Sequence, residues 1–160
     1  MLELEADARV WIFQSDRLLK EGEVERVHSE MKRFMQNWAA HGNELYGDFS
    51  IENGLFLIVG ADEKKAPPSG CSIDALTHKI KEIGKRLDVD FFNRLIIAYE
   101  DPSTDIHLVN METFKALIRR SEITEETTVY NNLIDTVGDL EDKWRTKVGR
   151  SWHKNLIEVL

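Results

Sequence analysis

The chain has a single cysteine, Cys71, in the stretch "PPSGCSIDALTHKI" (67–80), where a proline- and glycine-rich segment leads into an expected helix. The start of a helix presents free backbone N–H groups and the positive end of the helix dipole, which together favour a reactive thiolate. A small cysteine at a corner can equally be a packing residue. The stretch therefore raises two hypotheses, a nucleophile and a structural residue.

Thiol chemistry would also need a histidine base within hydrogen-bond reach of the sulfur. His41 in "WAAHG" and His153 in "SWH" are the candidates, and Ser72 with the helix amides could hold an oxyanion. The arginine that phosphatases place shortly after their cysteine is missing from "CSIDALTH". A thiol-dependent enzyme or redox-sensitive protein centred on Cys71, with His41 or His153 as the base, is therefore the alternative interpretation.

The same stretch resembles a small anion cradle, because "SGCS" combines hydroxyl groups, a flexible glycine and a helix start. The two asparagines of "VYNNL" are candidates to donate hydrogen bonds to a ligand, and the tryptophan of "SWH" is a candidate docking residue. Structural roles compete with each: a helix cap for Ser72 or Asp74, core packing for Trp38, and local backbone hydrogen bonds for the asparagines. The candidate ligand-binding residues are Trp38, His41, Ser69, Gly70, Cys71, Ser72, Asp74, Asn131, Asn132 and Trp152.

Neither a metal site nor a cofactor is expected. The chain has no HExxH motif and no pair of close cysteines, and Asp74, His78 and His41 match no known ligand spacing. ATP bound at "PPSGCS" would lack a phosphate-loop lysine, and Lys64 and Lys65 are the nearest cations.

Composition limits the classes of function. The chain has 160 residues, 42% of them hydrophobic and 31% charged, which is typical of one folded domain with a small addition. A formal net charge of −8 disfavours nucleic acid as a partner, because that binding depends on basic groups that neutralise phosphates. No apolar run reaches the ~20 residues that cross a membrane, and no signal peptide is expected, so a cytoplasmic location without membrane insertion is predicted.

Hydrophobic spacing predicts a β-α-β-β-α-β order over residues 1–101, which form the core. Strands are indicated by β-branched and aromatic runs, and "ENG" is typical of a hairpin turn. Helices are indicated by apolar residues every three or four positions, the first ending at Gly42. This order is that of a ferredoxin-like split βαββαβ sheet in the α+β class. The expected strands are 8–15, two within 44–62, and 90–100, and the expected helices are 23–42 and 72–87.

Residues 102–160 are expected to form a C-terminal appendage packed on the core. A short strand, a helix capped by Asn110 and a second short strand come first. A tail with Trp144 and Trp152 follows, and its tryptophans should cover the sheet or contact a partner.

Four stretches, "WAAHG", "SGCSID", "TVYNNL" and "SWH", resemble in this order a group of short, uncharacterised bacterial proteins, chiefly of the Bacteroidetes, commonly labelled ABC transporter ATPases. The likeness spans roughly residues 9–157. The label does not fit the sequence, because an ABC ATPase holds nucleotide phosphates with a Walker A loop, GxxxxGK[ST], and the chain contains no such string. The resemblance therefore implies the family and not ATPase activity. Residues 106–134 are also similar in topology to the small bacterial GYF-like protein-interaction module, without its opening "GP".

The favoured interpretation is a cytosolic, non-catalytic interaction or small-ligand-binding protein. A split βαβ sheet leaves one face open, and dimers on such a face are common for the fold. A homodimer, or another protein partner, is therefore predicted, and a small anionic ligand is a further candidate.

Overall fold

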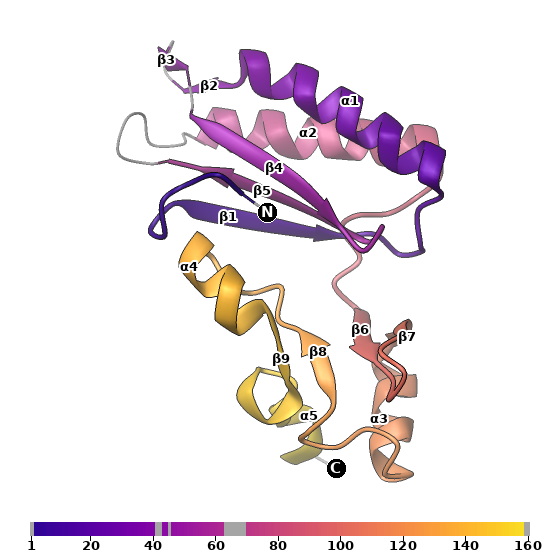
Figure 1. Cartoon of the computed structure of the whole chain (residues 1–160). Helices are drawn as coiled ribbons and strands as arrows, with labels where there is room; N and C mark the ends of the chain where they lie inside the picture. Colours follow the sequence, from indigo (N-terminus) through magenta and orange to yellow (C-terminus); the bar gives the residue numbers. More distant parts are fainter. Residues whose placement is uncertain (1, 41–42, 45, 63–69, 159–160) are drawn as a thin grey trace. The chain divides into compact units, whose positions relative to one another are not determined.

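A computed structural model describes residues 2–40, 43–44, 46–62 and 70–158 of the chain (Figure 1). Its contacts define two compact units. Unit 1 is Met1–Asn93 with Asp135–Gly138, and unit 2 is Arg94–Ile134 with Asp139–Leu160. Each unit contains helices and antiparallel strands, which confirms the α+β class. The sequence had placed the division after residue 101, whereas the two units separate at residues 93–94.

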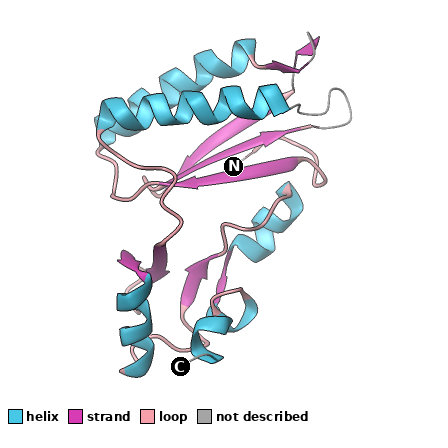
Figure 2. Cartoon of the chain, turned by 180° about the vertical axis from the view of Figure 1, so that it is seen from behind, coloured by secondary structure: helices cyan, strands magenta, loops and turns pink. Residues whose placement is uncertain are grey.

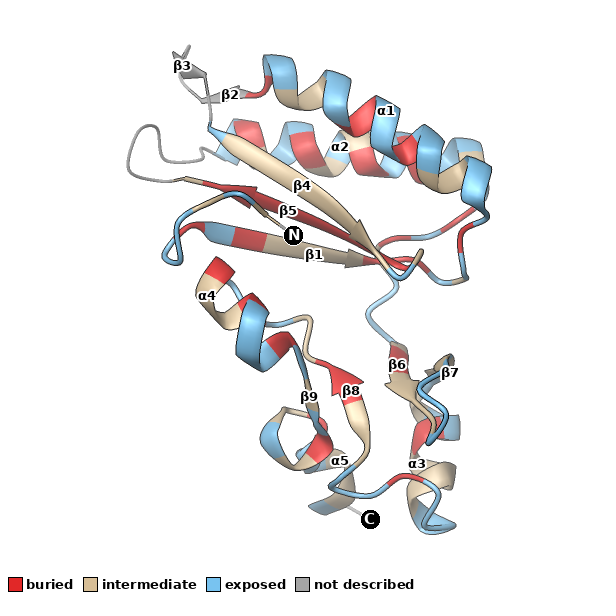
Figure 3. Ribbon diagram, viewed as in Figure 1, coloured by how far each residue is buried: buried red, intermediate tan, exposed pale blue. Residues whose placement is uncertain are grey.

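Unit 1 is built on a three-stranded antiparallel sheet in the order β1-β5-β4. Its strands are β1 (Arg9–Gln14), β4 (Gly47–Glu52) and β5 (Phe56–Ala61), and every residue of β5 is buried (Figure 3). The turn between β4 and β5 has positive φ angles at Asn53 (56°) and Gly54 (62°), a conformation that asparagine and glycine tolerate. The hairpin predicted from "ENG" is therefore confirmed.

Two long helices, α1 (Glu21–Asn37) and α2 (Gly70–Leu87), lie on the same face of this sheet (Figures 1 and 2). Their apolar stripes point at the sheet, because side chains three and four positions apart share one helix face. The core that results contains Val27, Met31, Leu57, Val59, Leu76, Ile80 and Ile83, each no more than 1% exposed.

Helix α1 ends earlier than the sequence suggested. Its last residue is Asn37, and Trp38 has an extended backbone with ψ of 124°. Short strands β2 (Ala39–Ala40) and β3 (Asn43–Glu44) follow and pair with each other. The predicted stop at Gly42 lies outside the described residues.

Arg17 ties the two helices together at one end. Its Nη1 and Nη2 donate to the two oxygens of Glu23, at 2.8 and 2.7 Å, and Nη2 also donates to the carbonyl of Leu87 at 2.7 Å. Hydrogen bonds from the Arg17 guanidinium, and then from the Lys20 backbone, lower the pKa of Glu23 to about 2. The start of α1 and the end of α2 thus share one satisfied ion pair.

Unit 2 contains a four-stranded antiparallel sheet in the order β7-β6-β8-β9. Asn110 caps α3, as predicted, because its Oδ1 accepts a hydrogen bond from the backbone N–H of Thr113 at 2.8 Å. The core of the unit includes Phe114, Ile123, Val129 and Val148. Its strands are β6 (Ile96–Glu100), β7 (Ile106–Asn110), β8 (Thr128–Tyr130) and β9 (Arg145–Lys147). Its helical segments are α3 (Met111–Arg119), a π-helical turn (Leu140–Trp144), a 3₁₀ turn (Val148–Arg150) and α5 (Lys154–Glu158). The boundary between the two units falls within α4 (Val137–Asp139).

The predicted ferredoxin-like sheet is not confirmed. That arrangement requires the strand expected at 90–100 to join the strand at 8–15 in one sheet. Instead, β6 covers only Ile96–Glu100 and pairs with β7 and β8. The tight hairpin at Asp101–Asp105 brings β7 beside β6, with Asp101 Oδ1 accepting from the N–H groups of Ser103 and Asp105 at 2.8 and 3.1 Å. Local pairing thus places β6 in the second sheet.

No helix among the described residues combines the length and the apolar character that a membrane crossing requires.

Helix α2 ends in a tight reversal that leaves no room beside Gly84. Asp88 has a φ of 56°, and the N–H of Val89 donates back to the carbonyl of Gly84 at 2.9 Å, which is the bond pattern of a Schellman cap. A Cβ at Gly84 would lie 2.6 Å from the carbonyl oxygen of Val89, whereas a Cβ at Gly22 in α1 would meet nothing within 4 Å.

Gly84→Ala is therefore expected to lower the free energy of unfolding by about 1–3 kcal/mol through overpacking. Gly22→Ala is the matched control, and it is expected to be neutral or to stabilise by up to about 1 kcal/mol. Urea melts followed by circular dichroism measure both, and equal effects of the two substitutions would contradict the packing shown for Gly84.

Candidate functional site

The stretch around Cys71 forms the first turn of α2, which the structure describes from Gly70 onward. Cys71 is exposed, and Ser72 is buried with 2% exposure. The hypothesis that Cys71 is a packing residue is therefore wrong, because the helix turns about 100° per residue and carries Ser72 inward instead. Ser72 and Asp74 lie inside the helix, so neither is its cap, and Ser69 falls outside the described residues.

Trp38 and Ser72 are the two candidate residues that meet in unit 1. The indole Nε1 of Trp38 donates to the backbone carbonyl of Ser72 at 2.8 Å. Trp38 is 2% exposed, and its ring lies 6.1 Å from the ring of Trp11. Both residues are therefore part of the core, where they join the end of α1 to the start of α2.

His153 lies in unit 2 and is buried with 1% exposure. Its Nδ1 is 2.7 Å from Ser151 Oγ, and its ring stacks on that of Trp152 with centroids 3.9 Å apart. Burial lowers the pKa of His153 from 6.5 to about 4, so the ring is neutral at pH 7. His153 and Trp152 thus pack against one another, while His41 lies outside the described residues.

The asparagine pair also makes local contacts in unit 2. Asn131 Oδ1 accepts from the backbone N–H of Leu133 at 3.2 Å, and Asn132 Oδ1 accepts from Trp144 Nε1 at 3.0 Å. These bonds hold the turn after β8 and the buried Trp144 in place.

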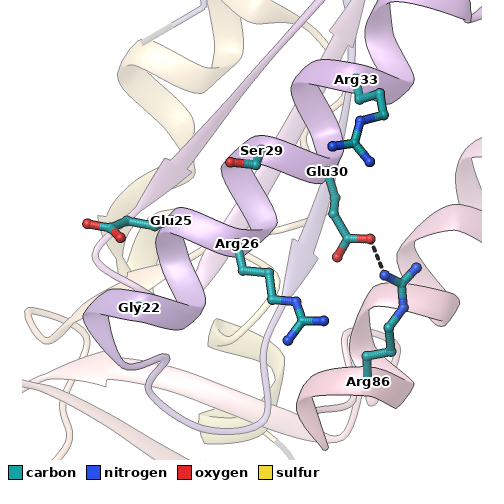
Figure 4. A pocket seen from close by; sticks show the side chains of 7 residues that line it. All are labelled: Gly22, Glu25, Arg26, Ser29, Glu30, Arg33 and Arg86. Atoms are coloured by element: carbon teal, nitrogen blue, oxygen red, sulfur yellow. Dashed lines mark ion pairs between the residues drawn. The ribbon is translucent and has the colours of Figure 1, made fainter.

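A different set of residues forms a groove between α1 and α2 (Figure 4). The groove has a volume of about 470 Å³. Figure 4 shows Arg86 reaching the carboxylate of Glu30, with the side chains of Arg33 and Arg26 on either side of Glu30. The lining residues are Gly22, Glu25, Arg26, Ser29, Glu30, Arg33 and Arg86.

Glu30 is the buried charge of the groove, with 8% of its surface exposed. Its Oε1 lies 2.5 Å from Arg86 Nη1 and 3.5 Å from Lys79 Nζ. Its Oε2 is buried and has no hydrogen-bond partner among the described residues. A buried carboxylate is costly unless it is paired, so the two cations of α2 stabilise Glu30 through only one of its oxygens.

The cations of α2 are also shared with a second carboxylate. Glu82 pairs with Arg86, and its Oε1 lies 3.7 Å from Lys79 Nζ. The charge of Lys79, and then that of Arg86, lowers the pKa of Glu82 from 4.5. Lys79 and Arg86 are therefore already engaged with carboxylates.

Arg26 and Arg33, by contrast, have no hydrogen bond or ion pair within the part of the chain that the structure describes. Both are exposed on α1. The lining contains three guanidinium groups and two carboxylates, so it is net positive in a chain whose formal net charge is −8. Guanidinium groups present several N–H donors in a planar fork that matches carboxylate and phosphate oxygens.

The sequence analysis missed this groove, although a signal for it is present. Positions 22, 26, 29 and 33 of α1 recur every three or four residues, as the apolar stripe does, and they define a second, polar stripe on the same helix. Charged stripes at this spacing are usually solvated faces. The placement of α2 beside this stripe is what turns it into a groove.

The described residues contain no group of three histidine, cysteine, aspartate or glutamate side chains that could hold a metal ion. Comparisons with protein-family models, with curated proteins and with solved structures found no match. The likeness to the Bacteroidetes group therefore stays a prediction, and any function has to be argued from the geometry.

The exposure of Cys71 and the burial of Ser72 predict that substitution changes stability little at Cys71 and lowers it more at Ser72. Cys71→Ser is expected to change the free energy of unfolding by less than about 0.5 kcal/mol, as is usual at exposed positions. Ser72→Leu is expected to cost about 1–3 kcal/mol, because the larger side chain overpacks the junction with Trp38. Urea melts of the two variants test this pair, and a larger loss for Cys71→Ser would contradict it.

The buried neutral ring of His153 predicts a loss of stability in acid. As the pH falls below about 6.5, the unfolded chain binds a proton that folded His153 does not accept until about pH 4. Stability is therefore lost across this window, by up to about 3 kcal/mol, and this group causes no further loss below it.

Urea melts of the wild type and of His153→Asn between pH 7 and pH 4 measure this effect. The asparagine amide can donate to or accept from Ser151 but has no proton to gain, so the variant should lose less stability over the same range. Equal pH dependence of the two proteins would rule out His153 as the cause, whatever their absolute stabilities.

Proposed function

We propose that this protein is a non-catalytic binding protein and that its ligand is a small anion held in the groove between α1 and α2. The observation that carries the proposal is the convergence of Arg26, Arg33 and Arg86 on one groove (Figure 4). Like charges repel, so three neighbouring arginines in an acidic chain need a counter-charge, and Glu30 supplies only part of it.

Arg26 and Arg33 are the groups available to such a ligand. Arg86 is held by Glu30 and Glu82, whereas the two arginines of α1 have no partner among the described residues. An anion placed between them would accept charge-assisted hydrogen bonds from both. The groove supports binding, since its lining contains no histidine or cysteine and its polar side chains other than the arginines are one serine and two carboxylates.

The placements of Cys71 and His153 add support for a role without thiol catalysis. Cys71 is exposed in the first turn of α2 in unit 1, and His153 is buried against Trp152 and Ser151 in unit 2. The position of each residue follows from the packing of its own unit, without a catalytic role.

The homodimer stays a prediction, but the open sheet face on which it was based is not present at the central strand. It was expected on an open face of the sheet. All six residues of the central strand β5 are buried, so neither face of that strand is open.

Isothermal titration calorimetry with inorganic phosphate at low ionic strength tests the anion site. Arg26→Gln and Arg33→Gln are each expected to weaken phosphate binding by roughly tenfold, the size of one lost charge-assisted hydrogen bond. Lys32→Gln is the matched control, because it removes the same charge from an exposed position next to Arg33 that does not line the groove.

A wild type that binds neither phosphate nor sulfate at millimolar concentration would refute the proposed function. An equal loss of affinity in Lys32→Gln and Arg33→Gln would show that general charge, and not the groove, attracts the anion.

A further inference from the structure

We infer that Glu30 makes the groove selective for an oxyanion that carries its own hydrogen-bond donor, of which hydrogen phosphate is the simplest example. The inference rests on the proposed anion site and specifies its ligand class. It assigns Glu30 a role in specificity, in addition to its ion pair with Arg86.

The unequal state of the two carboxylate oxygens of Glu30 is the starting point. Oε1 is shared by Arg86 and Lys79, while Oε2 is buried and accepts no hydrogen bond from the described residues. A buried acceptor without a donor costs free energy, and such groups in folded proteins usually have a partner or a function. A donor supplied by a ligand in the groove would satisfy Oε2.

Oε2 has almost no exposed area in this structure, so a ligand reaches it only when the neighbouring side chains move. Figure 4 shows Glu30 extending from α1 into the groove, with the heads of Arg26 and Arg33 on either side of it. Both arginines are exposed and without partners among the described residues, so they can rotate onto an anion. That rotation would bring the anion against Oε2.

An anion in this position meets a carboxylate as well as guanidinium groups. An oxyanion that is fully deprotonated and has no other donor would place two acceptors against each other, which is unfavourable. Hydrogen phosphate keeps a P–OH group near neutral pH, and it can donate to Oε2 while its other oxygens accept from the arginines. Sulfate has the same shape and no proton to donate. The volume of about 470 Å³ also leaves room for an organic phosphate with hydroxyl groups.

Calorimetric titrations with inorganic phosphate and with sulfate at pH 7 separate the two cases. The wild type is expected to bind phosphate at least about ten times more tightly than sulfate, the ratio expected for one hydrogen bond to a charged group gained or lost. Glu30→Gln should reduce this preference to within about threefold, because the amide can donate to either anion. Glu21→Gln, which removes a carboxylate from an exposed position of α1 outside the lining, should keep the preference of the wild type.

The outcomes distinguish this inference from the proposed function. Equal binding of phosphate and sulfate by the wild type would overturn the role of Glu30 and leave the anion site standing, whereas binding of neither would overturn both. A phosphate preference that persists in folded Glu30→Gln would also overturn the inference. If Glu30→Gln does not fold by circular dichroism, the wild-type comparison alone decides.

Titration with glucose 6-sulfate shows which group of the ligand donates to Oε2, because its hydroxyl groups replace the P–OH that sulfate lacks. Tighter binding of glucose 6-sulfate than of sulfate, lost in Glu30→Gln, supports the inference with an organic hydroxyl as the donor. Equal weak binding of both sulfates, beside strong binding of phosphate, supports it with the donor on the phosphate itself.

Discussion

The burial of strand β5 is the constraint on which unit 1 depends. All six of its residues are buried, so apolar cover is needed on both faces of the sheet. On one face that cover is α1 and α2, whose apolar stripes are both turned toward Leu57 and Val59. Two helices that share one face must lie side by side, and the residues on the flanks that face each other are then brought together. The groove is a consequence of this packing.

Two arginine–glutamate arrangements in unit 1 show how packing separates structural charges from available ones. Arg17 engages both oxygens of Glu23, and the pKa of Glu23 falls to about 2 as a result of that fully satisfied pair. Arg86 reaches only one oxygen of Glu30. The first arrangement joins helix ends and has little left to offer a ligand. The second leaves a buried acceptor near two arginines without partners among the described residues, and the proposed anion site depends on these groups.

Much of the local structure follows from the sequence, because its causes are local. The turn at Asn53 and Gly54, the cap at Asn110 and the apolar stripes of α1 and α2 each depend on residues within a few positions of one another. The partner of a strand is a different kind of property. Residues 90–100 have the composition of a strand, but nothing in that segment states whether it pairs with β1 or with β7, since both pairings satisfy the same backbone groups.

The sequence by itself determined the α+β class, most element positions and the acidic character of the chain. Only the tertiary structure decided the site. The residues that looked chemically active, Cys71 and His153, are explained by exposure at a helix start and by burial against Trp152. The groove was not visible beforehand, because Glu30 and Arg86 are 56 positions apart and meet only when α1 and α2 pack on the same face of the sheet. The role of a charged side chain depends on the residues around it, and long-range packing determines which residues those are.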